Sequence, residues 1–322
     1  MLTKKSKYDA VCYPGTSYAL LLYLLIEPYK IERTFFIADD RIPESIAQHL
    51  NHYRYTPPKE ISNSSKLVST IRDLYGYLKF DYIWAKNGLK SKDIYGMDHI
   101  GPCGATMSRY LLHRKEKFTL LEDGIGNYNM PQKQTIIKQH GFKHKIVTVL
   151  KQNYYPLWGT SERISEIYLT GIQDIPNIIK DKVSLFDLKD LWDKSNNKEL
   201  IKKIFNVNTI KNYDKDYILI LTQPQYRNVN KHIELYKDLT MNIPENKLII
   251  KPHPSTANIN YKKYFPEAIC LNDIAYTPIE LLFLIGLKIE KVLTITSSAS
   301  SFLKRYTNVE THIELFNKNS IY

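Results

Sequence analysis

Two adjacent acids follow an apolar stretch in the first half of the chain. The sequence FTLL (118–121) leads into Glu122 and Asp123, and Gly124 comes next. Successive side chains of an extended segment point to opposite faces, so one carboxylate can face a cleft while backbone N–H groups hold the other. A carboxylate that faces a hydroxyl can act as a general base. A solvated acidic turn has the same residue types, so both interpretations stay open.

A histidine between two prolines follows a second apolar stretch, in Lys251-Pro252-His253-Pro254. Pro254 restricts His253 to an extended backbone, which presents the imidazole in a fixed direction. Such a histidine can donate a hydrogen bond to a phosphate or protonate a phosphate that leaves. A rigid turn with an incidental histidine is the alternative.

Two further polar groups lie at the starts of predicted helices. Ser297 and Ser298 belong to a run with four serines in five residues, where free N–H groups and hydroxyls suit a phosphate, although one serine could simply cap the helix. Glu280 lies in the first turn of an apolar helix, where it either complements the dipole or accepts hydrogen bonds from ribose hydroxyls. Asp39 and Asp40, at the end of a predicted strand, are further candidates for acceptor binding.

The stretches that carry these residues alternate between strand and helix patterns. We predict a helical or irregular region over 150–210, helices over 17–27, 229–241 and 277–287, a helix within 99–115, another that starts near 299, and strands over 9–13, 33–39, 81–86, 93–99, 117–123, 217–224, 247–254, 268–272 and 291–298. This alternation is typical of mostly parallel sheets with helices on both faces. We therefore expect an α/β protein with two doubly wound, Rossmann-like domains, 1–155 and 156–322, that face a central cleft. Ligands of such folds bind outside the carboxyl ends of the strands, where each motif lies.

Composition narrows the class of partner. The net charge of +12 in 322 residues favours anionic partners, such as nucleotides or an acidic membrane surface, but no compact Lys/Arg tract indicates nucleic acid. Three widely spaced cysteines indicate a reducing compartment and neither a disulfide framework nor a zinc site. The apolar run 18–26 is too short to span a bilayer. Neither GxGxxG nor GxxxxGK[ST] occurs, so dinucleotide and P-loop sites are unsupported.

In their order along the chain, the acidic-acidic-Gly motif, Lys-x-His-Pro, the helix acid and the Ser-Ser pair resemble the motifs of bacterial sialyltransferases of the two-domain GT-B type. The most similar family is glycosyltransferase family 52, the lipooligosaccharide sialyltransferases. The resemblance spans about residues 9–305, with Asp123 and His253 130 positions apart (253 − 123). It implies a GT-B-like fold with an acceptor-side domain over 1–155 and a CMP-sugar donor domain over 156–322.

The resemblance also implies roles for the motif residues. Asp123 would be the catalytic base and His253 the group that stabilises or protonates the departing CMP phosphate. Ser297 and Ser298 would bind that phosphate, Glu280 the cytidine ribose, and the backbone of Lys251 and Pro252 would lie beside the cytosine; Glu122, Gly124, Gly126 and Asn127 would support the acid. Some family members use an Asp after the strand that corresponds to 217–224, where this chain has Gln223 and Gln225. Either Asp123 is the base here or another acid is.

The activity implied is inverting transfer of sialic acid, or a related nonulosonic acid, from a CMP-activated donor to a galactose-type hydroxyl of lipooligosaccharide or capsule. No cofactor or metal is expected, because the donor has a single phosphate and the sequence Asp214-Lys215-Asp216 does not lie in a convincing metal-binding loop. Expected partners are the CMP-sugar, a glycan or glycolipid acceptor, an anionic inner-membrane surface and a second copy in a homodimer, with no nucleic acid. The expected location is the cytoplasm, at the inner face of the inner membrane. The alternatives are a GT-B transferase with another donor (CMP-Kdo, CMP-legionaminic or pseudaminic acid, or a UDP-hexose) and a non-enzymatic basic peripheral protein.

Overall fold

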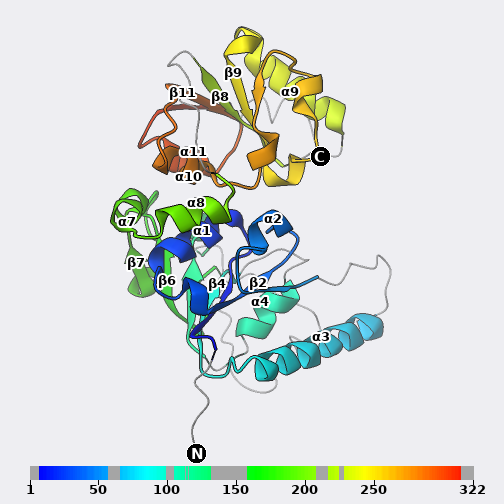
Figure 1. The fold of residues 1–322 in the computed structure, drawn as a ribbon, viewed down its shortest axis with the longest axis vertical. Helices are drawn as coiled ribbons and strands as arrows, with labels where there is room; N and C mark the ends of the chain where they lie inside the picture. The colour runs from blue at the N-terminus through cyan, green and yellow to red at the C-terminus, as the bar shows by residue number, and fades with distance from the viewer. Residues whose placement is uncertain are drawn as a thin grey trace, which may run out of the picture. The chain divides into compact units, whose positions relative to one another are not determined.

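The chain folds into two compact units, Met1–Lys198 and Glu199–Tyr322 (Figure 1). The computed structural model describes residues 7–56, 66–98, 105–112, 114, 116–131, 158–207, 217–224 and 228–312. Each unit contains one parallel sheet with helices in its connections, so the expected α/β class is confirmed. Within these ranges no helix is both long and apolar enough to cross a membrane. Gln225 and Asp214-Lys215-Asp216 lie outside the described residues.

The sheet of unit 1 has seven parallel strands in the order β3-β2-β1-β4-β5-β6-β7. The strands are β1 (Ala10–Tyr13), β2 (Thr34–Ala38), β3 (His52–Arg54), β4 (Asp93–Gly96), β5 (Phe118–Leu121), β6 (Ile164–Leu169) and β7 (Val183–Leu185). The chain adds strands to one side of β1 and then to the other. The strand order therefore reverses between β1 and β4, and a ligand crevice is expected beyond the carboxyl ends of these strands.

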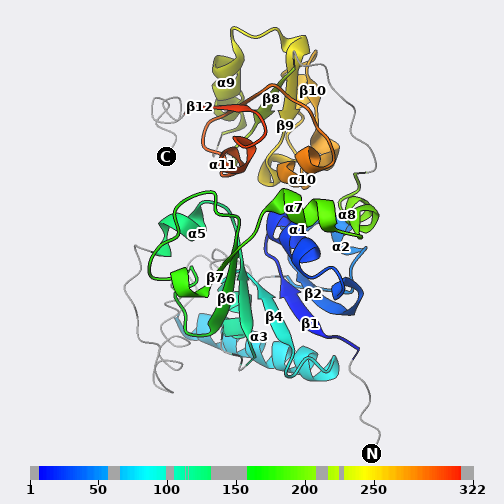
Figure 2. The same cartoon turned by 90° about the vertical axis from the view of Figure 1, so that its left-hand side faces the viewer.

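The helices of unit 1 are α1 (Ser17–Ile26), α2 (Glu44–Ala47), α3 (Lys66–Lys86), α4 (Ala105–Leu112), α5 (Gly126–Asn129) and α7 (Leu188–Lys194). Right-handed crossovers place the connections β1-to-β2 and β3-to-β4 on opposite faces of the sheet. Accordingly α1 packs beside α7 (Figure 2), whereas α3 packs beside α4 (Figure 1). Helix α1 is buried over nearly its whole length, as its continuous apolar sequence predicts, and Thr16 caps its start.

Unit 2 repeats the same topology with five parallel strands in the order β10-β9-β8-β11-β12. Its strands are β8 (Ile218–Leu221), β9 (Leu248–Lys251), β10 (Ile269–Cys270), β11 (Lys291–Thr294) and β12 (Asn308–Thr311), and its helices are α8 (Lys198–Ile204, which begins at the last residue of unit 1), α9 (Val229–Thr240), α10 (Ile279–Leu284) and α11 (Ala299–Leu303). One apolar core joins β8, β9 and β11 to α9 and to the loop around Tyr261. The reversal of strand order here falls between β8 and β11.

Three predictions about the elements and domains are wrong. The stretch 81–86, predicted as a strand, forms the last turns of α3, where Phe80 and Trp84 are buried at helical spacing. The predicted domain border at 155/156 is replaced by Lys198/Glu199, because β6 pairs with β5 and β7 pairs with β6, which extends the first sheet. The region 150–210 was expected to be helical or irregular, yet β6 has the alternating buried and exposed side chains of a strand.

Candidate active site

The two adjacent acids after β5 have different environments. Glu122 is fully buried, and it accepts hydrogen bonds from the backbone N–H of Thr170 (2.5 Å), the Thr170 hydroxyl (2.8 Å) and the Tyr128 hydroxyl (3.2 Å). Asp123 is partly exposed. The acid held by a backbone N–H group is therefore Glu122, and Asp123 is the carboxylate that a substrate can reach.

The loop after β5 fixes the position of Asp123 through its backbone. The N–H of Asp123 donates to Oδ1 of Asn127 at 2.7 Å, and Asn127 is fully buried. Gly124 has φ +80°, the left-handed region that favours glycine, so the chain can turn sharply after the acid. The Thr16 hydroxyl, which caps α1, lies 3.2 Å from Oδ1 of Asp123. Asp123 thus stands beyond the carboxyl end of its strand and beside the start of α1.

Gly126 is required by close packing. A Cβ atom at this position would lie 2.5 Å from a ring carbon of Trp158. Residue 126 is the first residue of α5, the short helix that also carries Asn127. The Trp158 ring therefore packs directly on the backbone of Gly126. This contact fixes the turn that places Asn127 next to the backbone N–H of Asp123.

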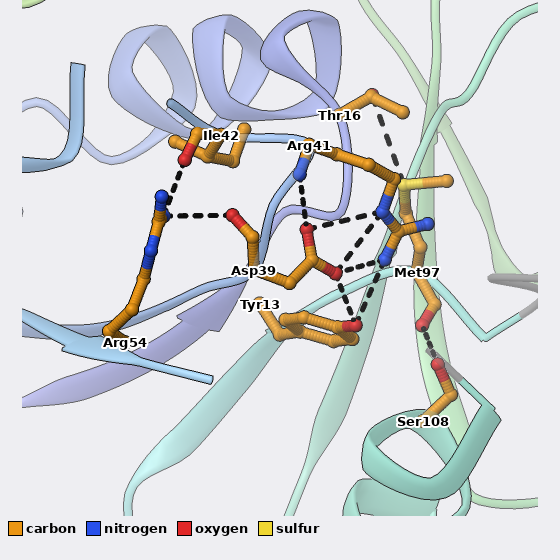
Figure 3. A network of polar contacts seen from close by, with 8 residues as sticks. All are labelled: Tyr13, Thr16, Asp39, Arg41, Ile42, Arg54, Met97 and Ser108. Carbon is orange, nitrogen blue, oxygen red and sulfur yellow. Dashed lines mark hydrogen bonds and ion pairs between the residues drawn. The ribbon is translucent and has the colours of Figure 1, made fainter. Parts of the chain in front are cut away.

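Asp39, the first of the two acids after β2, lies in a polar network (Figure 3). Asp39 is buried, and its carboxylate accepts from the Tyr13 hydroxyl at 2.8 Å and from the backbone N–H and the guanidinium of Arg41. Arg54 donates to the backbone carbonyl groups of Asp39 and Ile42. Asp39 therefore links the ends of β1 and β2, whereas Asp40 is exposed to solvent.

In unit 2, His253 follows β9 in the extended conformation that the flanking prolines predict, with φ −66° and ψ 145°. Its ring atom Nδ1 accepts from the backbone N–H of Ser255 at 3.2 Å and lies 2.8 Å from the Ser255 hydroxyl. Burial, together with the charge on Lys251, lowers the pKa of His253 to about 4. The ring is thus neutral near pH 7, and its one proton lies on Nε2.

A buried polar network supports His253 from behind. The backbone N–H of His253 donates to the Thr222 hydroxyl at 2.8 Å, and Thr222 follows β8. The Tyr261 hydroxyl joins Thr222 (3.4 Å), Thr256 (3.2 Å) and Nε2 of His232 (2.8 Å). Burial lowers the pKa of His232 to about 4, so this second histidine is also neutral at pH 7. The loop after β9 is therefore anchored at several points on its buried side.

Lys251 and Glu280 are both buried in unit 2. The ammonium group of Lys251 donates to the backbone carbonyls of Ala275 (2.7 Å) and Pro252 (3.3 Å). Burial lowers the pKa of Lys251 to about 7 and raises the pKa of Glu280 to about 7, while the attraction between the two charges opposes both shifts. Glu280 lies in the first turn of α10, as predicted. Protonation of this pair can therefore change near neutral pH.

Ser297 and Ser298 lie in a turn that follows β11, where the strand order of unit 2 reverses. We call this turn the serine turn. Ser297 is partly exposed and Ser298 is exposed, and the Ser298 side chain makes no capping hydrogen bond to α11. The backbone N–H of Ser297 donates to the Thr294 hydroxyl at 3.3 Å. Helix capping therefore does not explain Ser298, and its hydroxyl remains accessible to a ligand.

Gln223 follows β8, at the position that the resemblance had matched with an acid. Its side chain is buried and bridges the ends of β8 and β11, donating to the Thr294 hydroxyl (3.1 Å) and accepting from the Thr296 hydroxyl (2.9 Å). An amide serves this purpose because it both donates and accepts. Gln223 is therefore a structural residue of the serine turn.

The structure brings the predicted residues together in two groups, one in each unit. Asp123 and its supporting loop lie at the carboxyl edge of the first sheet. Lys251, Pro252, His253, Glu280, Ser297 and Ser298 follow or flank β9 and β11 of the second sheet. Sequence reasoning missed Thr16. A threonine before an apolar helix indicates a helix cap, but it does not indicate a contact with Asp123, which is 107 residues away. It also missed the network of Thr222, Tyr261 and His232.

Comparisons with known proteins agree with this organisation. A crystal structure of an α/β-galactoside α-2,3-sialyltransferase from Photobacterium phosphoreum superimposes with a TM-score of 0.58 at 13% identity, covering 95% of this chain and 90% of that one. A 2,6-sialyltransferase from Photobacterium sp. JT-ISH-224 matches with the same TM-score and identity, covering 91% of this chain and 69% of that one. These likenesses establish the fold class, which is that of GT-B-like proteins with two Rossmann-like domains.

The sequence itself establishes the family. Residues 77–315 match the family model of Glycosyltransferase family 52, and this range includes every predicted site residue from Glu122 to Ser298. An uncharacterized protein of Haemophilus influenzae is 29% identical over 231 residues, which is 69% of each chain. The chain belongs to glycosyltransferase family 52, and it is a glycosyltransferase. The non-enzymatic alternative is thereby discarded.

Proposed function

We propose that this chain transfers sialic acid, or a related nonulosonic acid, from a CMP-activated donor to a galactose-type hydroxyl of a surface glycan, with inversion at the anomeric carbon. The match to family 52 across both groups of site residues carries the proposal. The structurally similar 2,6-sialyltransferase from Photobacterium sp. JT-ISH-224 was crystallised with CMP and lactose. A CMP-linked donor and a galactose-containing acceptor are therefore the first substrates to test.

Asp123 is the residue we assign as the general base. It is the accessible member of the acid pair, and Asn127 and Gly124 fix its backbone. An inverting transfer needs a base that removes the acceptor proton while the oxygen attacks the anomeric carbon. Glu122 cannot take this role in the observed fold, because three protein donor groups surround its buried carboxylate.

His253 is the residue we assign to the departing phosphate. Its tautomer is set by Ser255, which occupies Nδ1 and leaves the Nε2–H as the donor. Negative charge accumulates on the phosphate as the bond to the sugar breaks, and a fixed donor lowers the barrier when that charge is greatest. With a pKa of about 4 the ring starts neutral, so it contributes a hydrogen bond first, and a phosphate that gains charge raises the basicity of the ring nearby.

Three other groups complete the proposed donor site. Ser297 and Ser298 supply a backbone N–H and hydroxyls to the phosphate, and Glu280 accepts from the ribose hydroxyls. The buried ammonium of Lys251 is tied to the carbonyl groups of Ala275 and Pro252. Lys251 therefore fixes the strand end and balances the charge of Glu280. The Pro252 carbonyl oxygen, which has two lone pairs, can still accept a second hydrogen bond from the cytosine amino group. In this proposal the single phosphate of the donor is neutralised by protein donors alone, without a metal.

The test is a donor panel with the purified chain. CMP release is measured from CMP-sialic, CMP-Kdo, CMP-legionaminic and CMP-pseudaminic acids, and UDP release from UDP-hexoses, each with and without lactose. We expect lactose-dependent CMP release from a CMP-nonulosonate that falls strongly in His253→Ala and stays unchanged in His49→Ala, an exposed histidine in unit 1. Turnover of a UDP-hexose alone would overturn the proposal.

A further inference from the structure

Helix α3 of unit 1 carries an exposed apolar stripe. Tyr75, Leu78 and Tyr82 are exposed by 69%, 62% and 65%, and their spacing of three and four places them on one face of the helix. Phe80 and Trp84, on the opposite face, are buried against the unit. Seven large apolar side chains are exposed among the described residues, and three of them lie on this face of α3. We call Tyr75, Leu78 and Tyr82 the α3 stripe.

Cations border the α3 stripe. Lys79 and Lys86 are exposed on the same side of the helix, and the Lys86 ammonium lies 5.9 Å from the ring centre of Tyr82. Asp81 is the one acid between Tyr75 and Lys86. It is paired with Arg114 at 3.1 Å and with the Tyr110 hydroxyl at 2.9 Å. The exposed face of α3 is therefore apolar and aromatic with positive edges.

A basic pocket of about 600 Å³ continues from the end of α3. Its charged lining consists of four cations and two acids, namely Lys90, Lys92, Arg114, Lys117, Asp93 and Glu116. Arg114 joins the pocket to the helix, because its guanidinium lies 4.7 Å from the ring centre of Trp84 and is paired with Asp81.

The acids of the basic pocket are largely neutralised within the protein. Arg114 holds Glu116 through two hydrogen bonds of 3.1 and 3.2 Å, and the pKa of Glu116 is lowered by this contact although burial opposes the shift. Among the residues that the structure describes, no ion pair within 4 Å involves Lys90 or Lys92. Lys90 can therefore meet an external anion, and so can Lys92, whose charge also helps to lower the pKa of Asp9, a residue already paired with Arg33.

The basic pocket lies at the end of the sheet where the strands begin. Asp93 is the first residue of β4, and Lys117 immediately precedes β5. Asp123 follows the carboxyl end of β5, so the basic pocket lies at the other end of this strand. Both views show α3 along the end of unit 1 where the strands start (Figures 1 and 2). A partner bound there leaves the candidate active site open.

We propose that the α3 stripe and the basic pocket together dock unit 1 on an anionic membrane surface. Tyrosine suits the boundary between headgroups and acyl chains, because its ring is apolar and its hydroxyl is polar. Lysines beside the stripe, and Lys90 and Lys92 in the pocket, meet the lipid phosphates. A second copy of the chain fits this surface less well, because a two-fold contact through α3 brings like charges together.

The test is flotation of the full-length protein with lipid vesicles, without donor or acceptor. One set of vesicles is phosphatidylcholine alone, and the other contains about one third phosphatidylglycerol. We expect binding to the anionic vesicles only, with loss of binding when NaCl rises from about 0.1 M to about 0.5 M. Free inorganic phosphate at millimolar concentration is the competitor that tests whether the pocket takes the phosphate without the lipid.

Two variants and two controls test the surface. Lys90→Gln with Lys92→Gln should lower the vesicle partition coefficient about 25-fold, roughly fivefold per cation. Tyr75→Ser, Leu78→Ser and Tyr82→Ser combined should lower it more than tenfold. Met241→Ser, exposed by 77% in unit 2, and Lys189→Gln with Lys194→Gln, which removes the same charge, should bind as wild type. Circular dichroism and turnover of a soluble acceptor should be unchanged in all variants.

Three results would overturn the docking surface. The first is a wild-type protein that does not float with anionic vesicles. The second is wild-type binding by both variants. The third is a dimer in solution that the α3 stripe variant converts to a monomer while its vesicle binding is kept, because the stripe would then contact a second copy. These three results concern vesicle binding and oligomeric state, and none depends on which sugar donor the enzyme uses. A failure of the docking surface can therefore be distinguished from a failure of the proposed function.

Discussion

The different roles of Glu122, a buried structural acid, and Asp123, the proposed general base, give the sharpest prediction. Asp123→Asn keeps the size of the side chain, and its amide oxygen can still accept from Thr16, which lies 3.2 Å from Oδ1. The backbone clamp by Asn127 is also kept. The variant loses only the ability to take a proton, so kcat should fall about 10²–10⁴-fold, or about 3–5 kcal/mol of barrier. Its unfolding free energy should change by less than about 1 kcal/mol.

Glu122→Gln should show the reverse pattern. The buried carboxylate accepts from Thr170 and Tyr128, and an amide keeps one acceptor oxygen for these groups but loses the negative charge that strengthens their hydrogen bonds. Hydrogen bonds to a buried charge contribute about 1.5–3 kcal/mol each, so we expect a loss of about 2–4 kcal/mol in unfolding free energy. Activity of the folded fraction should fall far less than in Asp123→Asn.

The assay measures both quantities on the same preparations. Urea unfolding followed by circular dichroism gives stability, and CMP release at saturating CMP-sialic acid and lactose gives kcat. Asp181→Asn, an exposed acid of unit 1, is the matched control and should change neither. The reasoning fails if Asp123→Asn retains a kcat within about threefold of wild type, or if Glu122→Gln abolishes turnover without any loss of stability.

Three further predictions concern the donor site and the loop that carries Asp123. Because burial raises the pKa of Glu280 to about 7, its carboxylate is lost as the pH falls through that value. CMP binding measured by calorimetry should therefore weaken from about pH 8 to about pH 6 more in wild type than in Glu280→Gln, which removes the titrating carboxyl group. The titration of CMP itself is common to both proteins, and a Lys251→Met, Glu280→Gln double variant removes the second titrating group of the pair. His253→Ala should lower kcat about 10²-fold or more without a new titration in that pH range, since the pKa of His253 is already about 4; a large effect on KM alone would place the histidine in ground-state binding. Gly126→Ala should cost about 1–3 kcal/mol of unfolding free energy, because the new Cβ would lie 2.5 Å from the Trp158 ring. Trp158→Leu in the same chain should recover part of this loss. An unchanged urea midpoint in Gly126→Ala would contradict the packing argument.

The strands that carry the site were predictable because burial leaves a plain signal in their sequences. Strand β8 is a continuous apolar run, as expected for a strand buried on both faces. The opposite orientation of Glu122 and Asp123 followed from the two-residue period of a strand. Which of the two is buried depends on Thr170, which is 48 residues away, and no local pattern reports that contact.

The errors have the same physical origin. The short apolar stretch 81–86 fits a strand and a buried helix equally well, and packing of Phe80 and Trp84 at helical spacing decides for the helix. Strands β6 and β7 lie at one side of the first sheet, where a half-exposed strand needs few apolar residues. The domain border depends on these two strands. Local sequence patterns therefore could not predict that unit 1 ends at Lys198.

A crystal structure of the protein with CMP and lactose tests the central claim most directly. The account predicts the CMP phosphate within hydrogen-bond distance of Nε2 of His253 and of the Ser297 turn, with the ribose at Glu280. It also predicts a galactose hydroxyl about 2.6–3.2 Å from a carboxylate oxygen of Asp123. CMP bound away from His253, or a lactose whose hydroxyls all lie beyond the reach of Asp123, would contradict it.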